Sequence, residues 1–427
     1  MELFMRKLVQ RCFLLALIHG CGALAAAQQT LTWEQLRARF EQQNPTLQAD
    51  QFNIEEAKAD EITAHLRPNP DLTLSVDGTQ IAPANGVWQP LGGTFESPGI
   101  SYLHERRHKR ELRLESARKG TLIAESNHAE VERTLLFNLR NAFVSTLQAN
   151  AVVLLAKDNL SYYDHVLDVG RERFRAGDIA QVDLDRLELQ RVQYESDLQT
   201  AMVNLRTAKI QLLALLNDRS PVEQFEVTGP FDFTDQLMPQ EDFRKTALET
   251  RPDLKAAVEA VDKAQTDHKL AVANGSTDPT IAGWYTHNGS FNNPAALNTL
   301  GVSVNFPLRI FDRNQGEKLR TQLDITRNQK LLEAMQTQVF SDVDSAYATV
   351  DSSLVLLRPY KAKYLQQAVR VRDTVSFAYQ HGGASLLDFL NAQNDYRSIQ
   401  LNYLNLVGSY LTAAAQLNLA VGREVIQ

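Results

Sequence analysis

The chain has 427 residues, a formal net charge of −7, 44% apolar residues and 22% charged residues. This composition excludes a disordered chain, and the mean hydropathy of −0.30 excludes a bundle of membrane-spanning helices. The acidic balance argues against nucleic acid as the main partner, because phosphate binding needs clustered Lys and Arg.

Residues 1–27 are predicted to be a cleaved export signal. Three basic residues precede a short apolar run, and three alanines at 25–27 precede the expected cleavage site. Cys12 and Cys21 both lie in this segment, so we expect the mature chain to have no disulfide. The residues before Cys21 weakly resemble a lipoprotein cleavage box, which leaves acylation of Cys21 open as an alternative.

Two stretches with a two-residue period follow the signal, at about 71–77 and 94–104, and predict a β-hairpin. A long helical hairpin is then expected over about 105–217, because no proline occurs from residue 99 through 220. We expect its two helices to be 50 to 60 residues long, at about 80–90 Å each. They should meet near Gly177.

The second half of the chain repeats the first. A shift of 205 residues places residues 174–177 on 379–382 and Asp183 on Asp388. Such self-similarity is typical of an internal duplication. The two predicted repeats extend over 28–232 and 233–427.

An apolar seam with heptad spacing follows each of the two matched turns. Ten positions from 184 to 215, spaced by three and four residues, are apolar or aromatic except for Arg191. The ten positions 205 residues later, from 389 to 420, are all apolar or aromatic. A seam of this length predicts long helices packed side by side.

The second repeat is expected to contain strands at about 279–287 and 299–306 and a helical hairpin at about 315–422. Alternating strands of this kind form either a half-buried soluble sheet or the wall of a membrane barrel. Four strands cannot close a barrel, and lipid does not tolerate an open edge. A membrane wall would therefore need several chains, and three copies would give twelve strands with room for a lumen.

These features together resemble the TolC family of outer-membrane efflux factors. The most specific pieces are the turns at 173–183 and 379–390. The segment 307–317 is similar to the signature that follows the last barrel strand in heavy-metal members of the CzcC and CusC type. The resemblance implies an α+β membrane protein with four β-strands and long coiled-coil helical hairpins per protomer. Three protomers would form a twelve-stranded β-barrel continuous with a periplasmic α-barrel.

The resemblance also implies partners and a role. It implies a homotrimer in the outer membrane that docks on a periplasmic adaptor (membrane fusion) protein and, through it, on an inner-membrane pump of the resistance-nodulation-division class. The trimer would be a passive exit duct for metal cations or other toxic small molecules, without a cofactor or a resident metal. We expect no enzymatic activity, because the sequence has no phosphate-binding glycine loop, nucleophile elbow or paired-histidine zinc motif.

Two alternatives stay open at this point. One is a soluble periplasmic coiled-coil scaffold or adaptor, in which the four β stretches form an ordinary small sheet. The other is the exit duct of a type I protein secretion system.

The two matched turns are the main candidate site. Their glycines predict helix C-caps in the left-handed conformation, and Ser385 with Asp388 predicts a capping box. By resemblance, these turns form the periplasmic mouth that meets the adaptor. The residues expected to dock there are Arg173, Gly177, Asp178, Asp183, Tyr379, Gly382, Gly383 and Ser385.

The resemblance also places a periplasmic gate at Asp388. Asn391 stands where a companion acid is expected, and Ala384 stands where a basic residue is expected. Three copies of Asp388 would still form a carboxylate ring, which would favour cations and raise its own pKa through like-charge repulsion.

A basic run at 106–110 follows the second predicted strand. One interpretation is a solvated helix start. The other is contact with phospholipid head groups, where the barrel passes into the helices. The residues of this second interpretation are Arg106, Arg107, Lys109 and Arg110.

Overall fold

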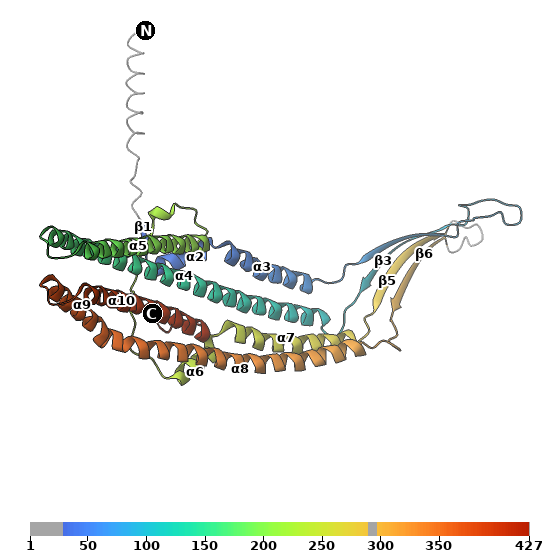
Figure 1. The fold of residues 1–427 in the computed structure, drawn as a ribbon. Coiled ribbons are helices and arrows are strands. Elements are labelled where there is room, and N and C mark those ends of the chain that lie inside the picture. The colour runs from blue at the N-terminus through green and yellow to red at the C-terminus, as the bar shows by residue number, and fades with distance from the viewer. Residues whose placement is uncertain (1–28, 289–296, 427) are drawn as a thin grey trace, which may run out of the picture. The chain divides into compact units, whose positions relative to one another are not determined.

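The computed structural model describes residues 29–288 and 297–426, which divide into two units (Figure 1). The first, called the tip unit below, contains residues 29–48, 131–249 and 341–426. The second, the sheet unit, contains residues 49–130, 250–288 and 297–340. Each unit therefore takes residues from both predicted repeats. The predicted signal and Cys21 lie outside the described residues.

The sheet unit contains four antiparallel strands in the order β2-β3-β5-β6. Each lies within one residue of its predicted bounds, and β3 pairs with β5 to join the two predicted hairpins. Among the described residues, β2 and β6 each pair with one strand only, so both are open edges. The strands are β2 Asp71–Asp77, β3 Phe95–Leu103, β5 Thr280–Asn288 and β6 Asn298–Asn305.

One face of this sheet is apolar and exposed. The register places Leu72 opposite Ile100, and Gly283 opposite both Ile100 and Val302. These residues share a face because directly paired residues point to the same side of a sheet. The face includes Leu74 and Leu300, whose side chains are 75% and 85% exposed. The opposite face carries mostly small polar residues, namely Thr73, Ser75, Ser97, Ser101, Thr286, Ser303 and Thr299.

Trp284 lies on the polar face, because it neighbours Tyr285 and successive side chains alternate across a strand. Its indole ring covers Gly301 on β6, where any Cβ would overlap the ring. The two adjacent aromatic residues therefore point to opposite sides of the sheet. Only Tyr285 shares the apolar face.

Long helices make up most of both units. The two that cross from one unit to the other are α4 (Lys109–Arg175) and α8 (Gln315–Pro359). The sheet unit also contains most of α3 (Pro45–His65) and α7 (Pro252–Asn274), whereas α2 (Trp33–Gln43) and α6 (Gln240–Thr250) belong to the tip unit. The remaining long helices of the tip unit are α5 (Gln181–Leu215), α9 (Leu365–Gln380) and α10 (Leu386–Val421).

The heptad prediction is confirmed on α5 and α10. Every predicted seam position is buried or half-buried, including Leu187 on α5 and Phe389 on α10. Arg191, the polar exception, donates a hydrogen bond of 2.6 Å to Asp164 on α4. The seam thus packs the helices of each hairpin side by side, with an ion pair at its one charged position.

The helix lengths differ from the prediction of two helices of about 50 to 60 residues each. α4 has 67 residues and α5 has 35. α5 ends early because Asn217 adopts a left-handed φ of +51° and a proline follows at position 221. The described chain then forms β4 (Phe225–Val227), which pairs in parallel with β1 (Gln29–Leu31), a small sheet that the sequence did not predict.

A π-helical turn, Tyr360–Tyr364, separates α8 from α9. Pro359 immediately precedes it and has no backbone N–H to continue the α-helical hydrogen bonds. Two ion pairs from the segment after β4 lie on either side of this proline. Arg358 binds Asp235 at 2.6 Å, and Lys361 binds Asp232 at 2.5 Å.

Candidate functional site at the helical turns

The turn between α4 and α5 ends the longest helix with a Schellman motif. The amide of Asp178 donates to the carbonyl of Arg173 at 2.9 Å, and the amide of Gly177 donates to Phe174 at 3.0 Å. Gly177 has a φ of +82°, which L residues rarely adopt. The predicted C-cap is confirmed.

The turn between α9 and α10 repeats this geometry. The amide of Gly383 donates to Ala378 at 2.7 Å, and that of Gly382 donates to Tyr379 at 3.2 Å. Gly382 has a φ of +75°, whereas Gly383 lies outside the left-handed region. One glycine in each turn therefore supplies the cap, at positions related by the 205-residue shift.

The two turns differ at the start of the following helix. The amide of Asp388 donates to Ser385 Oγ at 3.1 Å, and the Asp388 carboxylate accepts from the Ser385 amide at 3.2 Å. The predicted capping box is thus confirmed. Ala180 holds the equivalent position in the first turn and has no side-chain acceptor, so Asp183 lacks a capping partner of this kind.

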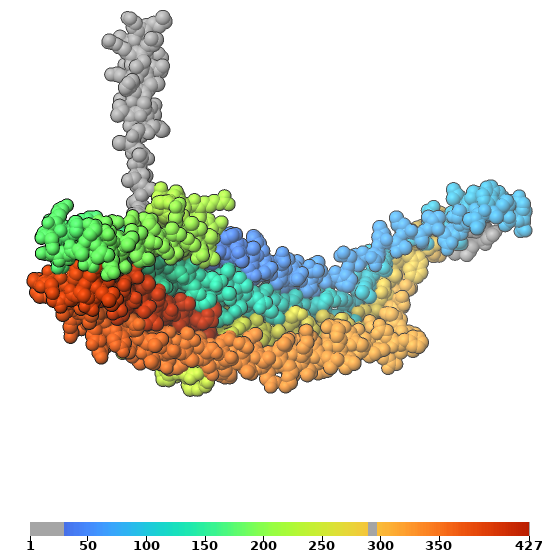
Figure 2. Space-filling view, in the orientation of Figure 1, coloured from blue at the N-terminus to red at the C-terminus, as the bar shows by residue number. Residues whose placement is uncertain are grey.

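The structure brings the two turns together through Arg173 and Tyr379, and Figures 1 and 2 show the turns side by side. Arg173 donates to the Tyr379 carbonyl at 3.0 Å, and its guanidinium carbon lies 5.0 Å from the Tyr379 ring centroid. The Tyr379 ring also stacks on Phe389, with ring centroids 4.9 Å apart. The Tyr379 ring on α9 thus contacts residues of two other helices, α4 and α10.

Tyr379 is 7% exposed, and burial raises the pKa of its hydroxyl. Its ring therefore joins the two hairpins, a burial that the predicted docking role did not anticipate. Arg173 is likewise half-buried against it. The docking residues that remain exposed are Gly177, Asp178, Gly382, Gly383 and Ser385, with Asp183 half-buried.

The two predicted gate residues are both exposed on α10. Asp388 lies in its first turn, and Asn391 follows one turn later. Hydrogen bonds from Ser385 hold the pKa of Asp388 below its ordinary value of 3.8. This effect opposes the like-charge repulsion expected in a ring of three copies.

A buried cluster of aromatic and aliphatic side chains supports both turns. Tyr163 on α4 is fully buried, donates to the Leu187 carbonyl at 3.1 Å and stacks on Tyr194 at 4.7 Å. Burial raises the pKa of the Tyr163 hydroxyl. Because Tyr379, Leu386 and Phe389 of the second hairpin belong to the same cluster, the turns cannot move apart without exposing it.

A polar network that the sequence did not predict lies next to this cluster. Tyr162 on α4 donates to Ser376 on α9 at 3.0 Å, and Gln393 on α10 donates to the same hydroxyl at 3.1 Å. Arg372 lies over the rings of Tyr396 and Tyr162, at 4.2 and 5.0 Å. In the sequence, the one sign of this network is a polar residue, Gln393, next to the apolar seam. Its presence there does not show which residues it bonds.

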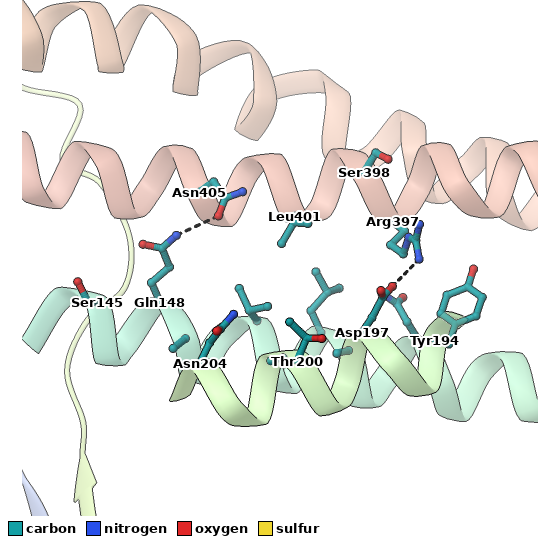
Figure 3. A pocket seen from close by; sticks show the side chains of 16 residues that line it. Ser145, Gln148, Tyr194, Asp197, Thr200, Asn204, Arg397, Ser398, Leu401 and Asn405 are labelled. Atoms are coloured by element: carbon teal, nitrogen blue, oxygen red, sulfur yellow. Dashed lines mark hydrogen bonds and ion pairs between the residues drawn. The ribbon is translucent and has the colours of Figure 1, made fainter. Parts of the chain in front are cut away.

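A pocket of about 510 Å³ lies between α4, α5 and α10 (Figure 3). Arg397 and Asp197 form an ion pair of 2.5 Å at one end, and Gln148 donates to Asn405 at 2.9 Å at the other. Leu401 lies between these two links in Figure 3. The first hairpin and α10 are therefore joined by a side-chain link at each end of the pocket.

The predicted basic run divides into exposed and buried residues. Arg106 and Arg107 are exposed, and Arg110 is half-buried beside Glu111. Lys109 differs from the head-group prediction, because its side chain is 4% exposed and binds Asp278 at 2.5 Å. Its charge is neutralised inside the sheet unit.

Neither a membrane-crossing helix nor a metal cluster occurs in residues 29–288 and 297–426. No helix there is both long enough and apolar enough to span a bilayer. Nowhere in these ranges do three His, Cys, Asp or Glu side chains come together as metal ligands.

The sequence matches the family described as outer membrane efflux protein twice, over residues 36–218 and 244–423. The chain belongs to this family. The TolC-family resemblance is thereby confirmed, and the protein is an outer-membrane efflux component with the TolC-like fold. Both candidate turns fall within the matched residues.

Individual relatives agree with the family. The chain is 24% identical over 381 residues to the cobalt-zinc-cadmium resistance protein CzcC of Cupriavidus metallidurans, covering 89% of this chain and 87% of CzcC. It is 22% identical to the outer membrane protein TolC of Escherichia coli, covering 71% of this chain and 64% of TolC. The crystal structure of CusC superposes with a TM-score of 0.76 at 17% identity, covering 92% of each chain.

Proposed function

We propose that three copies of this outer membrane efflux protein form a passive exit duct across the outer membrane and periplasm. The observation that carries the proposal is the open four-stranded sheet with one exposed apolar face. Such a face is stable next to lipid, but lipid does not tolerate the unpaired edges β2 and β6. Pairing β6 of one copy with β2 of the next closes a wall of twelve strands. The small polar residues of the other face then line the lumen.

The two turns form the periplasmic mouth of this duct. Threefold repetition brings three copies of Asp388 close together, with Asn391 one turn behind. The exposed backbone of Gly177, Gly382 and their neighbours is the surface offered to a periplasmic adaptor. An inner-membrane pump of the resistance-nodulation-division class supplies the energy through that adaptor, and the protein itself catalyses no reaction.

Metal cations are the proposed cargo, with other toxic small molecules as the next choice. The name of the relative CzcC and the carboxylate at the proposed mouth support this choice. Within the same proposal, residues 1–27 are the export signal, and residues 28–232 and 233–427 are the two repeats. The two separate family matches support the division into repeats.

Cysteine crosslinking tests the shared wall. In one protomer β2 and β6 are separated by three strand spacings, or about 14 Å. A bifunctional maleimide shorter than this therefore cannot join Leu74→Cys to Val302→Cys within one chain. We expect covalent dimers and trimers of the double variant in outer-membrane extracts.

Each single-cysteine variant and the unsubstituted chain serve as controls and should run as monomers on a denaturing gel after boiling, which dissociates trimers that are not crosslinked. Osmotic shock provides an independent measurement, because a soluble scaffold would be released with the periplasm. A released monomer without crosslinked species would contradict the duct.

A further inference from the structure

The chain segment after β6 carries an unusual density of exposed apolar side chains. Leu308 is 80% exposed and Phe311 is 89% exposed, and Phe306 and Ile310 are each more than half exposed. The segment leads from Asn305, the last residue of β6, to Gln315, the first residue of α8. Contiguous apolar surface of this kind marks an interaction site on a folded protein.

The alternation of β6 continues into this segment. Leu300, Val302 and Val304 lie on the apolar face, and the same two-residue spacing reaches Phe306 and Leu308. The even-numbered apolar residues thus extend beyond the point where strand pairing stops. The apolar stripe is longer than the strand that begins it.

The strands are short for the membrane that the proposed duct must cross. β6 has eight residues. At about 3.4 Å per residue and a tilt of about 45°, these cover about 19 Å, against an apolar band about 25 Å tall. Three further residues, through Leu308, bring the extended segment that begins at Asn298 to about 26 Å and its apolar stripe, from Leu300 to Leu308, to about 22 Å.

Cations gather at the same end of the sheet. Leu103, the last residue of β3, pairs with Thr280, and Thr280 pairs with Asn305. Arg106 and Arg107 therefore leave the sheet at the same end as residues 306–313, and Arg313 is exposed there as well. Among the described residues, no carboxylate forms an ion pair with the guanidinium group of Arg106 or Arg107.

The turn that presents these arginines is held in place. Arg107 and His108 have φ values of +60° and +56°, an uncommon conformation for two successive non-glycine residues. Asp278 accepts from the Arg106 amide at 2.9 Å and pairs with the buried Lys109. One carboxylate thus anchors both ends of the strained turn and leaves the two guanidinium groups exposed.

We propose that residues 306–311 are an interfacial membrane anchor, inserted into the periplasmic leaflet of the outer membrane beside head groups bound by Arg106, Arg107 and Arg313. The occupant is an anionic phospholipid surface, because apolar side chains flanked by arginines complement acyl chains flanked by phosphates. The anchor covers the part of the membrane's apolar band that β6 is too short to reach. This inference rests on the proposed duct.

Lipid quenching of fluorophores tests the anchor in full-length protein reconstituted in nanodiscs. Single cysteines replace Leu308, Phe311, Val302 or Leu331 and carry an environment-sensitive label. Lipids with a doxyl group near the head group should quench labels at residues 308 and 311, and lipids with a doxyl group deep in the acyl chain should quench the label at residue 302. Aqueous iodide should quench none of these three labels. The label at residue 331, an exposed apolar position on α8, should respond to iodide only.

The label at residue 302 separates the two proposals, because it lies on the lipid face of the duct itself. Quenching at 302 without quenching at 308 and 311 overturns the anchor and leaves the duct intact. An absence of lipid quenching at 302 overturns the duct. Labels at 308 and 311 that are shielded from both lipid and iodide place a second copy of the chain on this segment, which also overturns the anchor.

Substitution of the arginines tests the head-group contact. Trimers extracted with their surrounding lipid from phosphatidylcholine and phosphatidylglycerol membranes should be enriched in phosphatidylglycerol. Arg106→Gln and Arg107→Gln should each weaken this preference about fivefold. Lys330→Gln, an exposed cation on α8, is the matched control and should leave it unchanged. Equal lipid composition in all variants would overturn the head-group assignment.

Discussion

Arg173 and Tyr379 join the two helical turns, although they are 206 residues apart. The guanidinium group both donates to the Tyr379 carbonyl and covers its ring, and the ring in turn covers Phe389. The two hairpins are therefore fastened to each other at the mouth of the proposed duct. Any widening of that mouth within a protomer must break this contact first.

Arg173→Ala should favour the open mouth. Loss of one hydrogen bond and one cation–π contact removes about 1 kcal/mol from the closed state, or about fivefold in the ratio of open to closed channels. Single-channel recording in planar bilayers measures this ratio directly.

Arg175→Ala is the matched control for that measurement. Arg175 lies in the same turn but is exposed, and within residues 29–288 and 297–426 its one ion-pair partner is Glu172 on its own helix. Equal opening by both variants would mean that charge at the tip, and not the bond to Tyr379, controls the mouth.

Ser385→Ala should loosen the first turn of α10. It removes the oxygen that accepts from the Asp388 amide, a loss worth about 1 kcal/mol at an N-cap. Hydrogen exchange of the peptide that contains residues 381–392 should accelerate about fivefold. The reciprocal change Ala180→Ser creates the missing cap on α5 and should slow exchange there; faster exchange in that variant would contradict the assignment.

The charge of Asp388 should persist at mildly acidic pH. Because its pKa is lowered in the folded chain, its capping contribution is present above the ordinary pKa of 3.8 and is lost as pH falls through the lowered value. We expect the cation selectivity of the open channel, measured as a reversal potential, to stay constant from about pH 8 to about pH 5.

Asp388→Asn should remove this contribution to selectivity at every pH in that range. Asp183→Asn, at the equivalent position on α5, is the comparison. A selectivity midpoint well above 3.8 in the unsubstituted channel would mean that repulsion between three carboxylates outweighs the capping hydrogen bonds.

Gly301→Ala should destabilise the sheet. A methyl group at this position overlaps the ring of Trp284, and overpacking of this kind costs about 1–3 kcal/mol. The temperature at which the trimer dissociates on a denaturing gel should fall. Gly283→Ala is the control, since the nearest atom to its new Cβ is 3.8 Å away.

The double variant Trp284→Ala with Gly301→Ala should recover part of the lost stability, because the smaller residue 284 leaves room for the methyl group. Additive losses in the double variant would show that Gly301 is needed for a reason other than this ring.

Local periodicity accounts for what the sequence could predict. The seam through Leu187 and Phe389 follows from spacing alone, because burial repeats with the helical turn. The strands could be predicted from local spacing as well, because apolar residues alternate along them. Each helical turn could be predicted because it contains the glycine that caps the preceding helix. The strand count indicated that a membrane wall would need several chains. The family resemblance added the homotrimer and its adaptor and pump partners.

Partners distant in the sequence account for what could not be predicted. Lys109 looked like part of a basic surface, but its partner Asp278 is 169 residues away. Tyr379 looks like an exposed tip residue in the sequence, but its ring is buried against Arg173 and Phe389. The pairing of β1 with β4 involves three residues in each strand, too few for a detectable pattern.

The π-helical turn at Tyr360–Tyr364 also sets the direction, about the helix axis, in which the turn between α9 and α10 faces. Its wider turn holds an extra residue, and each residue rotates a helix by about 100°. Loss of one residue here would rotate α9 by about 100° relative to α8 and swing Ser376 and Tyr379 away from the first hairpin. One-residue insertions and deletions at this point are thus a simple evolutionary route to reorienting the mouth without altering its contact residues.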